Sequence, residues 1–195
     1  MVFESLLPEA VAALVGVRHA RVDALERTPR KPGLYAFSGD EVAWRQLGLT
    51  PAFRDQPLYV GKAEKSLSGR DVGTHFATGK TGSSTVRRSL AALLVDDLHL
   101  VAVPRNLAKP DGSANFARAS ASDRRLSEWM DARLTLATWV TPDGAELDEI
   151  ETLVLRQLQP PLNLDKVGQP RQRLRSARRR MADAARAWRP DSAPA

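Results

Sequence analysis

A carboxylate interrupts the apolar side of the last strongly periodic segment of this chain, AELDEIETLVLRQLQ, at Glu151. At 100° per residue, one side of a helix here is formed by Leu147, Ile150, Val154 and Leu158, and Glu151 falls among them. A carboxylate facing a protein interior is unfavourable unless it is protonated, paired with a cation or bound to a metal. Glu151 is therefore a candidate metal ligand. A buried ion pair or a helix-edge position is the alternative.

The stretch VGTHFATGKTGSST, residues 72–85, has the outward form of a nucleotide phosphate-binding loop. That motif places four residues between its first Gly and Gly-Lys-Ser/Thr, so that successive backbone N–H groups surround one phosphate. Here five residues separate Gly73 from Gly79, and no apolar strand precedes the stretch. The spacing disfavours a nucleotide hydrolase.

Composition narrows the class of protein further. The chain has 195 residues, of which 43% are hydrophobic and 27% charged, enough for the core of one domain. It contains no cysteine, which excludes disulfides, thiolate metal sites and cysteine nucleophiles. Glu4 and Glu9 lie where a secretory signal would be basic, and no apolar run is long enough to cross a membrane. These features predict a soluble, cytoplasmic protein.

The positive charge is concentrated near the C-terminus. Between Gln169 and Pro190 lie eight arginines and one acidic residue, so this segment has a net charge of +7. The whole chain has a net charge of +6, so the rest of it is close to neutral. Such a segment predicts contact with a phosphate backbone; a solubilising helix, or one that docks on the same protein, is the alternative. The predicted nucleic-acid contacts are Lys80, Arg87, Arg171, Arg173, Arg175, Arg178, Arg179 and Arg180.

These side chains need elements to position them. Periodicity and turn residues predict strands at 33–39, 57–63, 98–104 and 135–142. Helices are predicted at 4–25 with a break at Pro8, from a cap among residues 83–85, at 123–134 and at 145–159. The order predicts an α/β fold of the α+β type: a small, mainly antiparallel three-stranded sheet flanked by helices.

The same patterns divide the chain into three parts. They are an N-terminal helical extension (1–30), a central domain (31–168) with insertions near 39–56 and 105–122, and an arginine-rich helical tail (169–195).

One ordered set of residues carries a family resemblance. The tripeptide Gly33-Leu34-Tyr35 and the tetrapeptide Tyr59-Val60-Gly61-Lys62 are followed by Arg70, His75, Glu151 and Asn163. Over residues 31–166 this order resembles the GIY-YIG nuclease superfamily, whose metal-binding Glu precedes an Asn by the twelve residues found here. Tyr59 follows Tyr35 at a separation of 24 residues, which exceeds the usual family spacing, so we expect residues 39–56 to loop out.

The resemblance implies a divalent-metal-dependent endonuclease that hydrolyses DNA phosphodiester bonds. Glu151 would bind Mg²⁺ (or Mn²⁺), Arg70 would hold the phosphate by a bidentate contact, and Lys62 would add positive charge. Either Tyr35 or Tyr59 would accept a proton from the attacking water, which requires nearby cations to lower a pKa of about 10.

The remaining residues have supporting roles in that family pattern. His75 would assist or replace the tyrosine, and Asn163 would be a hydrogen-bonding anchor. Lys80 and the helix N-terminus near it would face a DNA phosphate. A non-catalytic nucleic-acid-binding module of the same fold and an RNA-directed nuclease remain as alternatives, and the oligomeric state is not determined by the sequence.

Overall fold

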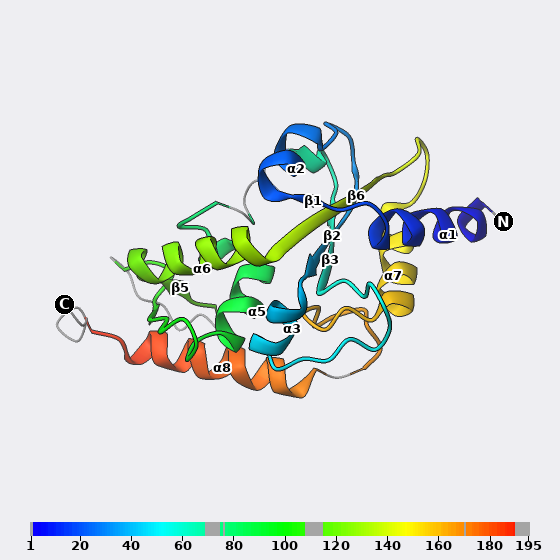
Figure 1. Cartoon of the computed structure of the whole chain (residues 1–195). Helices are drawn as coiled ribbons and strands as arrows, with labels where there is room; N and C mark the ends of the chain where they lie inside the picture. The colour runs from blue at the N-terminus through cyan, green and yellow to red at the C-terminus, as the bar shows by residue number, and fades with distance from the viewer. Residues whose placement is uncertain (1, 69–74, 76, 108–114, 170, 190–195) are drawn as a thin grey trace.

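The structure is a computed structural model that describes residues 2–68, 75, 77–107, 115–169 and 171–189 (Figure 1). Its main sheet is antiparallel throughout, with strand order β1-β6-β2-β3. The strands are β1 (His19–Ala20), β2 (Gly33–Gly39), β3 (Tyr59–Ala63) and β6 (Leu134–Val140). A second, two-stranded sheet pairs β4 (Ala102–Val103) with β5 (Ala117–Arg118). The predicted antiparallel α+β fold is confirmed, with the short β1 added as a fourth strand.

Helices make up most of the rest. They are α1 (Val2–Val15), α2 (Arg21–Arg27), α3 (Glu41–Gln46), α5 (Thr85–Leu93), α6 (Ser120–Arg133), α7 (Leu147–Leu158) and α8 (Gln172–Ala187), with the 3-10 turn η2 (Thr81–Ser83) before α5. The predicted break at Pro8 is wrong, because α1 continues through it and ends at Val15. The chain then enters β1 instead of extending the helix to residue 25. No helix in the described ranges is long and apolar enough to cross a membrane.

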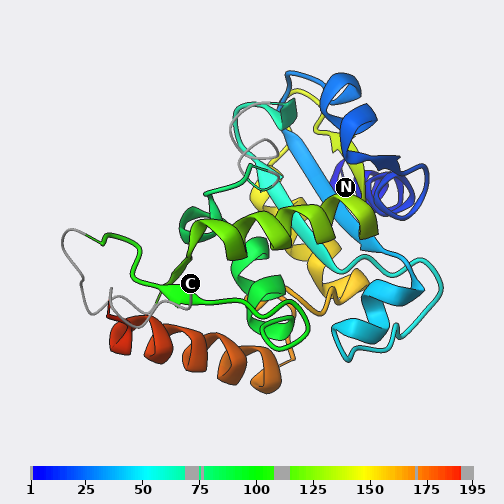
Figure 2. The same ribbon diagram turned by 60° about the vertical axis from the view of Figure 1, so that its left-hand side comes forward.

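The sheet separates two cores. Side chains alternate across β2, so Leu34 and Ala36 pack with α1 and α7, whereas Tyr35 and Phe37 face the helices on the other side. Figures 1 and 2 show α1 and α7 on one side of the sheet and α5, α6 and α8 on the other. The tyrosines of β2 and β3 therefore point toward the α5 and α8 side.

The segment 39–56 does not loop out as expected. It forms α3, whose N-cap Asp40 accepts a hydrogen bond from the Ala43 backbone at 2.7 Å. Ala43, Trp44 and Leu47 are buried in the core on the Tyr35 side of the sheet. Apolar residues at helical spacing gain more from this burial than from exposure in a loop.

Helix α8 also packs on the body of the protein. It lies against α5 and β4, and its buried face is formed by Leu174, Ala177, Met181, Ala182 and Ala185. Arg173 donates hydrogen bonds to the Leu47 carbonyl at 2.9 Å and to that of Gly48, at the C-terminus of α3. The arginine-rich segment is thus a docked helix over the residues that the structure describes.

Candidate active site

Tyr35 and Gly61 lie opposite each other in the pairing of β2 with β3. The Tyr35 ring lies over Gly61 so closely that a β-carbon at residue 61 would come within 2.4 Å of the Tyr35 hydroxyl. No side chain larger than hydrogen fits there without displacing the tyrosine. The glycine of the YVG motif therefore fixes where the Tyr35 hydroxyl lies.

A hydrogen-bonded chain continues from Tyr35 into the loop before α5. The Tyr35 hydroxyl lies 2.5 Å from His75 Nε2, and His75 Nδ1 lies 2.6 Å from Ser84 Oγ. Ser84 also caps α5 by accepting from the Arg87 backbone N–H at 3.2 Å. Burial, together with the charges of Arg87 and Arg88, lowers the pKa of His75 to about 4. His75 is therefore neutral near pH 7, and its unprotonated ring nitrogen can accept a hydrogen bond.

The loop that carries His75 is supported by a buried ion pair. Arg87 Nη2 lies 3.1 Å from Asp123 Oδ2, and both side chains are almost completely buried. Asp123 also accepts hydrogen bonds from the Thr81 hydroxyl and the Gly79 backbone, while Arg87 donates to the His75 carbonyl at 3.3 Å. The GKTGSS stretch is thereby held as a scaffold for His75.

This arrangement corrects one predicted nucleic-acid contact. Arg87 is a predicted nucleic-acid contact in the sequence, but its side chain has no exposed surface. It lies inward because Asp123, far along the chain on α6, supplies a buried counter-charge. Lys80, by contrast, is exposed on the same loop.

Tyr59 lies beside Tyr35, with ring centroids 6.3 Å apart. Burial, and next the negative charge of Glu151, raise the pKa of Tyr59 to about 12. A phenol in this environment holds its proton more tightly than a free tyrosine. The raised pKa of Tyr59 thus disfavours it as the proton acceptor near neutral pH.

Glu151 faces inward on α7, as its helical phase predicts, and its side chain is only 12% exposed. Its Oε2 accepts a hydrogen bond from Lys166 Nζ at 2.6 Å. The same ammonium lies 2.9 Å from Asp148 Oδ1, which is also 2.8 Å from Lys62 Nζ. These two lysines lower the pKa of Asp148 to about 2. The hydrogen bonds that Lys62 donates to Asp148 and Glu64 raise the pKa of Lys62.

The donor set fits a small divalent cation. Glu151 and Asp148 lie one turn apart on α7, and both reach the same point, the Lys166 ammonium. Within the ranges described, no group of three or more His, Cys, Asp or Glu side chains is arranged to hold a metal. One or two carboxylates, with water and a substrate phosphate completing the shell, is the usual protein environment of Mg²⁺. The residues present therefore suit Mg²⁺ or Mn²⁺.

Asn163 closes the edge of the sheet beside this site. Its side-chain amide accepts from the Val60 N–H at 3.0 Å and donates to the Val60 carbonyl at 2.7 Å. The Leu162 N–H adds a hydrogen bond to the Leu58 carbonyl at 2.9 Å. Asn163 thus pairs with backbone groups at the edge of β3 that another strand would otherwise bond. These bonds also fix the position of the chain that leads to Lys166.

The other predicted site residues are distributed differently. Arg70 lies outside the described residues. On α8, Arg179 and Arg180 are exposed and Arg178 is half-buried. Arg171 and Arg175 donate hydrogen bonds to the carbonyls of Gln159 and Leu164, respectively, and so hold α8 on the preceding chain.

Sequence reasoning missed Asp148 and Lys166 as neighbours of Glu151. Asp148 had a detectable signal, because it precedes Glu151 by three residues and so shares its side of the helix. Lys166 had none, since its position depends on a left-handed backbone conformation, φ 61°, after the chain has passed the edge of β3.

The site thus brings together two neighbouring tyrosines of an antiparallel sheet, a histidine and a helical carboxylate. Comparison with protein-family models matches residues 53–180 to the GIY-YIG catalytic domain. The chain therefore belongs to the GIY-YIG catalytic domain family, which implies a nucleic-acid substrate. The match contains Tyr59, His75, Glu151 and Asn163, begins after β2, and ends within α8. Comparisons with curated proteins and with solved structures find no match.

Proposed function

We propose that this protein is a divalent-metal-dependent endonuclease that hydrolyses DNA phosphodiester bonds, with Tyr35 as the residue that takes the proton of the attacking water. The observation that carries the proposal is the hydrogen bond of Tyr35 to a neutral, Ser84-anchored His75. Such a partner accepts the hydrogen bond of the Tyr35 hydroxyl, which orients the phenol and makes its oxygen a better proton acceptor.

The proton route follows from this geometry. In the tautomer with its proton on Nδ1, His75 donates to Ser84 and accepts from the Tyr35 hydroxyl through Nε2. As water attacks phosphorus, its proton passes to the Tyr35 oxygen while the Tyr35 proton passes to His75. The P–O bond to the leaving strand then breaks and the leaving oxygen takes a proton from solvent water, which gives one new 5′ or 3′ phosphate and one hydroxyl. Tyr59 keeps its proton and is a hydrogen-bond donor to this centre.

Charge on the phosphate is balanced from the opposite side. Glu151, with Asp148 beside it, would hold Mg²⁺ or Mn²⁺, which neutralises the phosphate and stabilises the leaving oxygen when bound. Lys62 adds positive charge and keeps Asp148 ionised. We assign Arg70 to the phosphate on the family pattern, in which a guanidinium binds two phosphate oxygens at once.

Cleavage of supercoiled plasmid with Mg²⁺, Mn²⁺ or EDTA tests the proposal. We expect metal-dependent nicking or linearisation that falls at least about a hundredfold in Glu151→Gln and in Tyr35→Phe. The matched variant Glu149→Gln, exposed on the same helix, should cleave like the wild type. Cutting that survives in Glu151→Gln would contradict the site. Cutting of matched RNA but not DNA would contradict the substrate.

A further inference from the structure

A group of guanidinium side chains lies beside Tyr59 and takes no direct part in the proton route above. Arg88 on α5 is 8% exposed. Its Nη1 donates to the Gly82 carbonyl at 2.8 Å and its Nη2 contacts the Thr85 hydroxyl at 3.3 Å. Its buried Nε has no hydrogen-bond partner in the part of the chain that the structure describes. Arg88 is thus a buried cation without a carboxylate to pair with among these residues.

Arg178 brings a second guanidinium to the same place from α8. It borders the buried face of α8, next to Ala177, where this helix packs along α5. No hydrogen bond or ion pair joins it to another described residue. Burial, and next the charges of Arg178 and Arg105, lower the pKa of Arg88 to about 10. Arg105 follows β4 and lies against Gly82. Clustered cations of this kind are unfavourable unless an anion binds between them.

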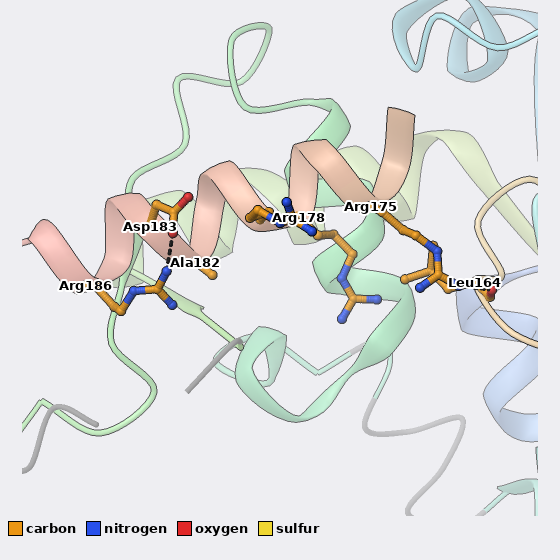
Figure 3. A pocket seen from close by; sticks show the side chains of 7 residues that line it. Leu164, Arg175, Arg178, Ala182, Asp183 and Arg186 are labelled. Atoms are coloured by element: carbon orange, nitrogen blue, oxygen red, sulfur yellow. Dashed lines mark hydrogen bonds and ion pairs between the residues drawn. The ribbon is translucent and has the colours of Figure 1, made fainter. Parts of the chain in front are cut away.

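The cluster opens into a groove along α8. The groove has a volume of about 410 Å³ and is lined by Leu164, Arg175, Arg178, Arg179, Ala182, Asp183 and Arg186. Figure 3 shows Arg175, Arg178, Ala182, Asp183 and Arg186 on α8, with Asp183 bonded to Arg186, and Leu164 on the chain that precedes the helix. The acidic residue of the groove is therefore already engaged, and the Arg178 end keeps its positive charge.

We propose that Arg88 and Arg178 form a phosphate subsite, which holds a DNA backbone phosphate next to the one cleaved at Tyr35, and that the groove along α8 carries the same strand onward. A phosphodiester is the anion that fits, because guanidinium groups bind phosphate oxygens and the groove repeats positive charge along its length. The position relative to the cleaved bond rests on the proposed function; binding at the subsite does not.

Binding of a short, mixed-sequence, fluorescein-labelled DNA duplex, measured by anisotropy in EDTA over a range of salt, tests the subsite without cleavage. We expect Arg178→Gln and Arg88→Gln each to bind about tenfold more weakly, as for loss of one charge-assisted contact. The slope of log affinity against log salt should shrink by about 0.9 for Arg178→Gln. Arg156→Gln, which removes an exposed charge from α7 across the sheet, is the control and should match the wild type.

The outcomes separate the two proposals. If Arg178→Gln has the affinity and salt slope of Arg156→Gln while the wild type cleaves plasmid, the subsite is wrong and the proposed function stands. If the wild type does not cleave but Arg178→Gln loses affinity, the subsite stands and the proposed function is wrong. A matched RNA duplex that binds more tightly than DNA would overturn DNA as the ligand. Thermal unfolding of Arg88→Gln checks that its weaker binding is not a loss of fold.

Discussion

His75 is kept neutral by its surroundings, and this couples the stability of the fold to pH. Its pKa is about 4 in the folded protein and about 6.5 when exposed in the unfolded chain. Between these values the unfolded state binds a proton that the folded state does not, so stability falls as pH decreases from 6.5 to 4. Above pH 6.5 His75 is neutral in both states, and its full contribution to the stability of the fold is present.

We therefore expect the free energy of unfolding to decrease by up to about 3 kcal/mol over this interval because of His75 alone. Urea unfolding at several pH values measures it. His75→Gln keeps a side chain able to bond Tyr35 and Ser84 but cannot titrate, so its curve should be flatter by that amount. Parallel curves for the two proteins would contradict the assigned environment.

Lys166 competes with a divalent cation for Glu151, since its ammonium lies 2.6 Å from Glu151 Oε2. We expect Lys166→Met, which removes the charge at similar length, to bind Mn²⁺ about fivefold more tightly, the equivalent of an ion pair worth ~1 kcal/mol. Titration calorimetry or Mn²⁺ electron paramagnetic resonance measures this directly. Lys65→Met, at an exposed position on the chain after β3, is the control. Weaker Mn²⁺ binding in Lys166→Met would contradict the competition.

At the scale of secondary-structure elements, the register in which β2 pairs with β3 determines the geometry of the site. Pairing Tyr35 with Gly61 places the tyrosine ring over the one residue of β3 that leaves room for it. A shift of one residue would turn Tyr35 to the α7 side of the sheet, away from His75. The segments Gly33-Leu34-Tyr35 and Tyr59-Val60-Gly61 are thus one geometric unit and not two separate motifs.

Gly61→Ala tests that unit. We expect it to destabilise the fold by about 1–3 kcal/mol through overpacking and to lower cleavage strongly, because the Tyr35 hydroxyl must move away from His75. Urea unfolding and plasmid cleavage are the two measurements. Gly82→Ala is the matched control for folding, since its added β-carbon would meet neighbours no closer than 3.5 Å. Normal cleavage by Gly61→Ala would show that the ring position is not required.

At the scale of the whole molecule, α8 is part of the fold. Ala177, Met181, Ala182 and Ala185 belong to the same core as Tyr35 and Phe37. An arm that served only to attract DNA could be removed with the body intact, but removal of this helix would expose α5 and the core beneath it. Its basic outer face and its apolar inner face thus have separate roles.

Met181→Ala distinguishes docking from a free arm. The side chain is 6% exposed, so we expect a loss of about 2–4 kcal/mol in the free energy of unfolding. Arg180→Ala, at an exposed neighbouring position, should change it by less than about 0.5 kcal/mol. Chemical denaturation of both variants measures the difference. Equal stability would mean that α8 does not pack on the body in solution.

The sequence by itself determined the features that depend on neighbours along the chain. Strand alternation located β2 and β3, and helical phase turned Glu151 inward instead of Glu149. The physical reason is that side-chain direction within one helix or strand follows its backbone period. The ordered set of residues from Tyr35 to Asn163 then indicated the family, and the match to the GIY-YIG catalytic domain confirms it.

The tertiary structure decided the partners of those residues. Arg87 is buried because Asp123 meets it from another helix, Lys166 reaches Glu151 after the chain has passed the edge of β3, and Arg178 lies beside Arg88 because α8 docks on α5. Each depends on groups distant in sequence, and periodicity holds no information about which distant charge will neutralise a buried one.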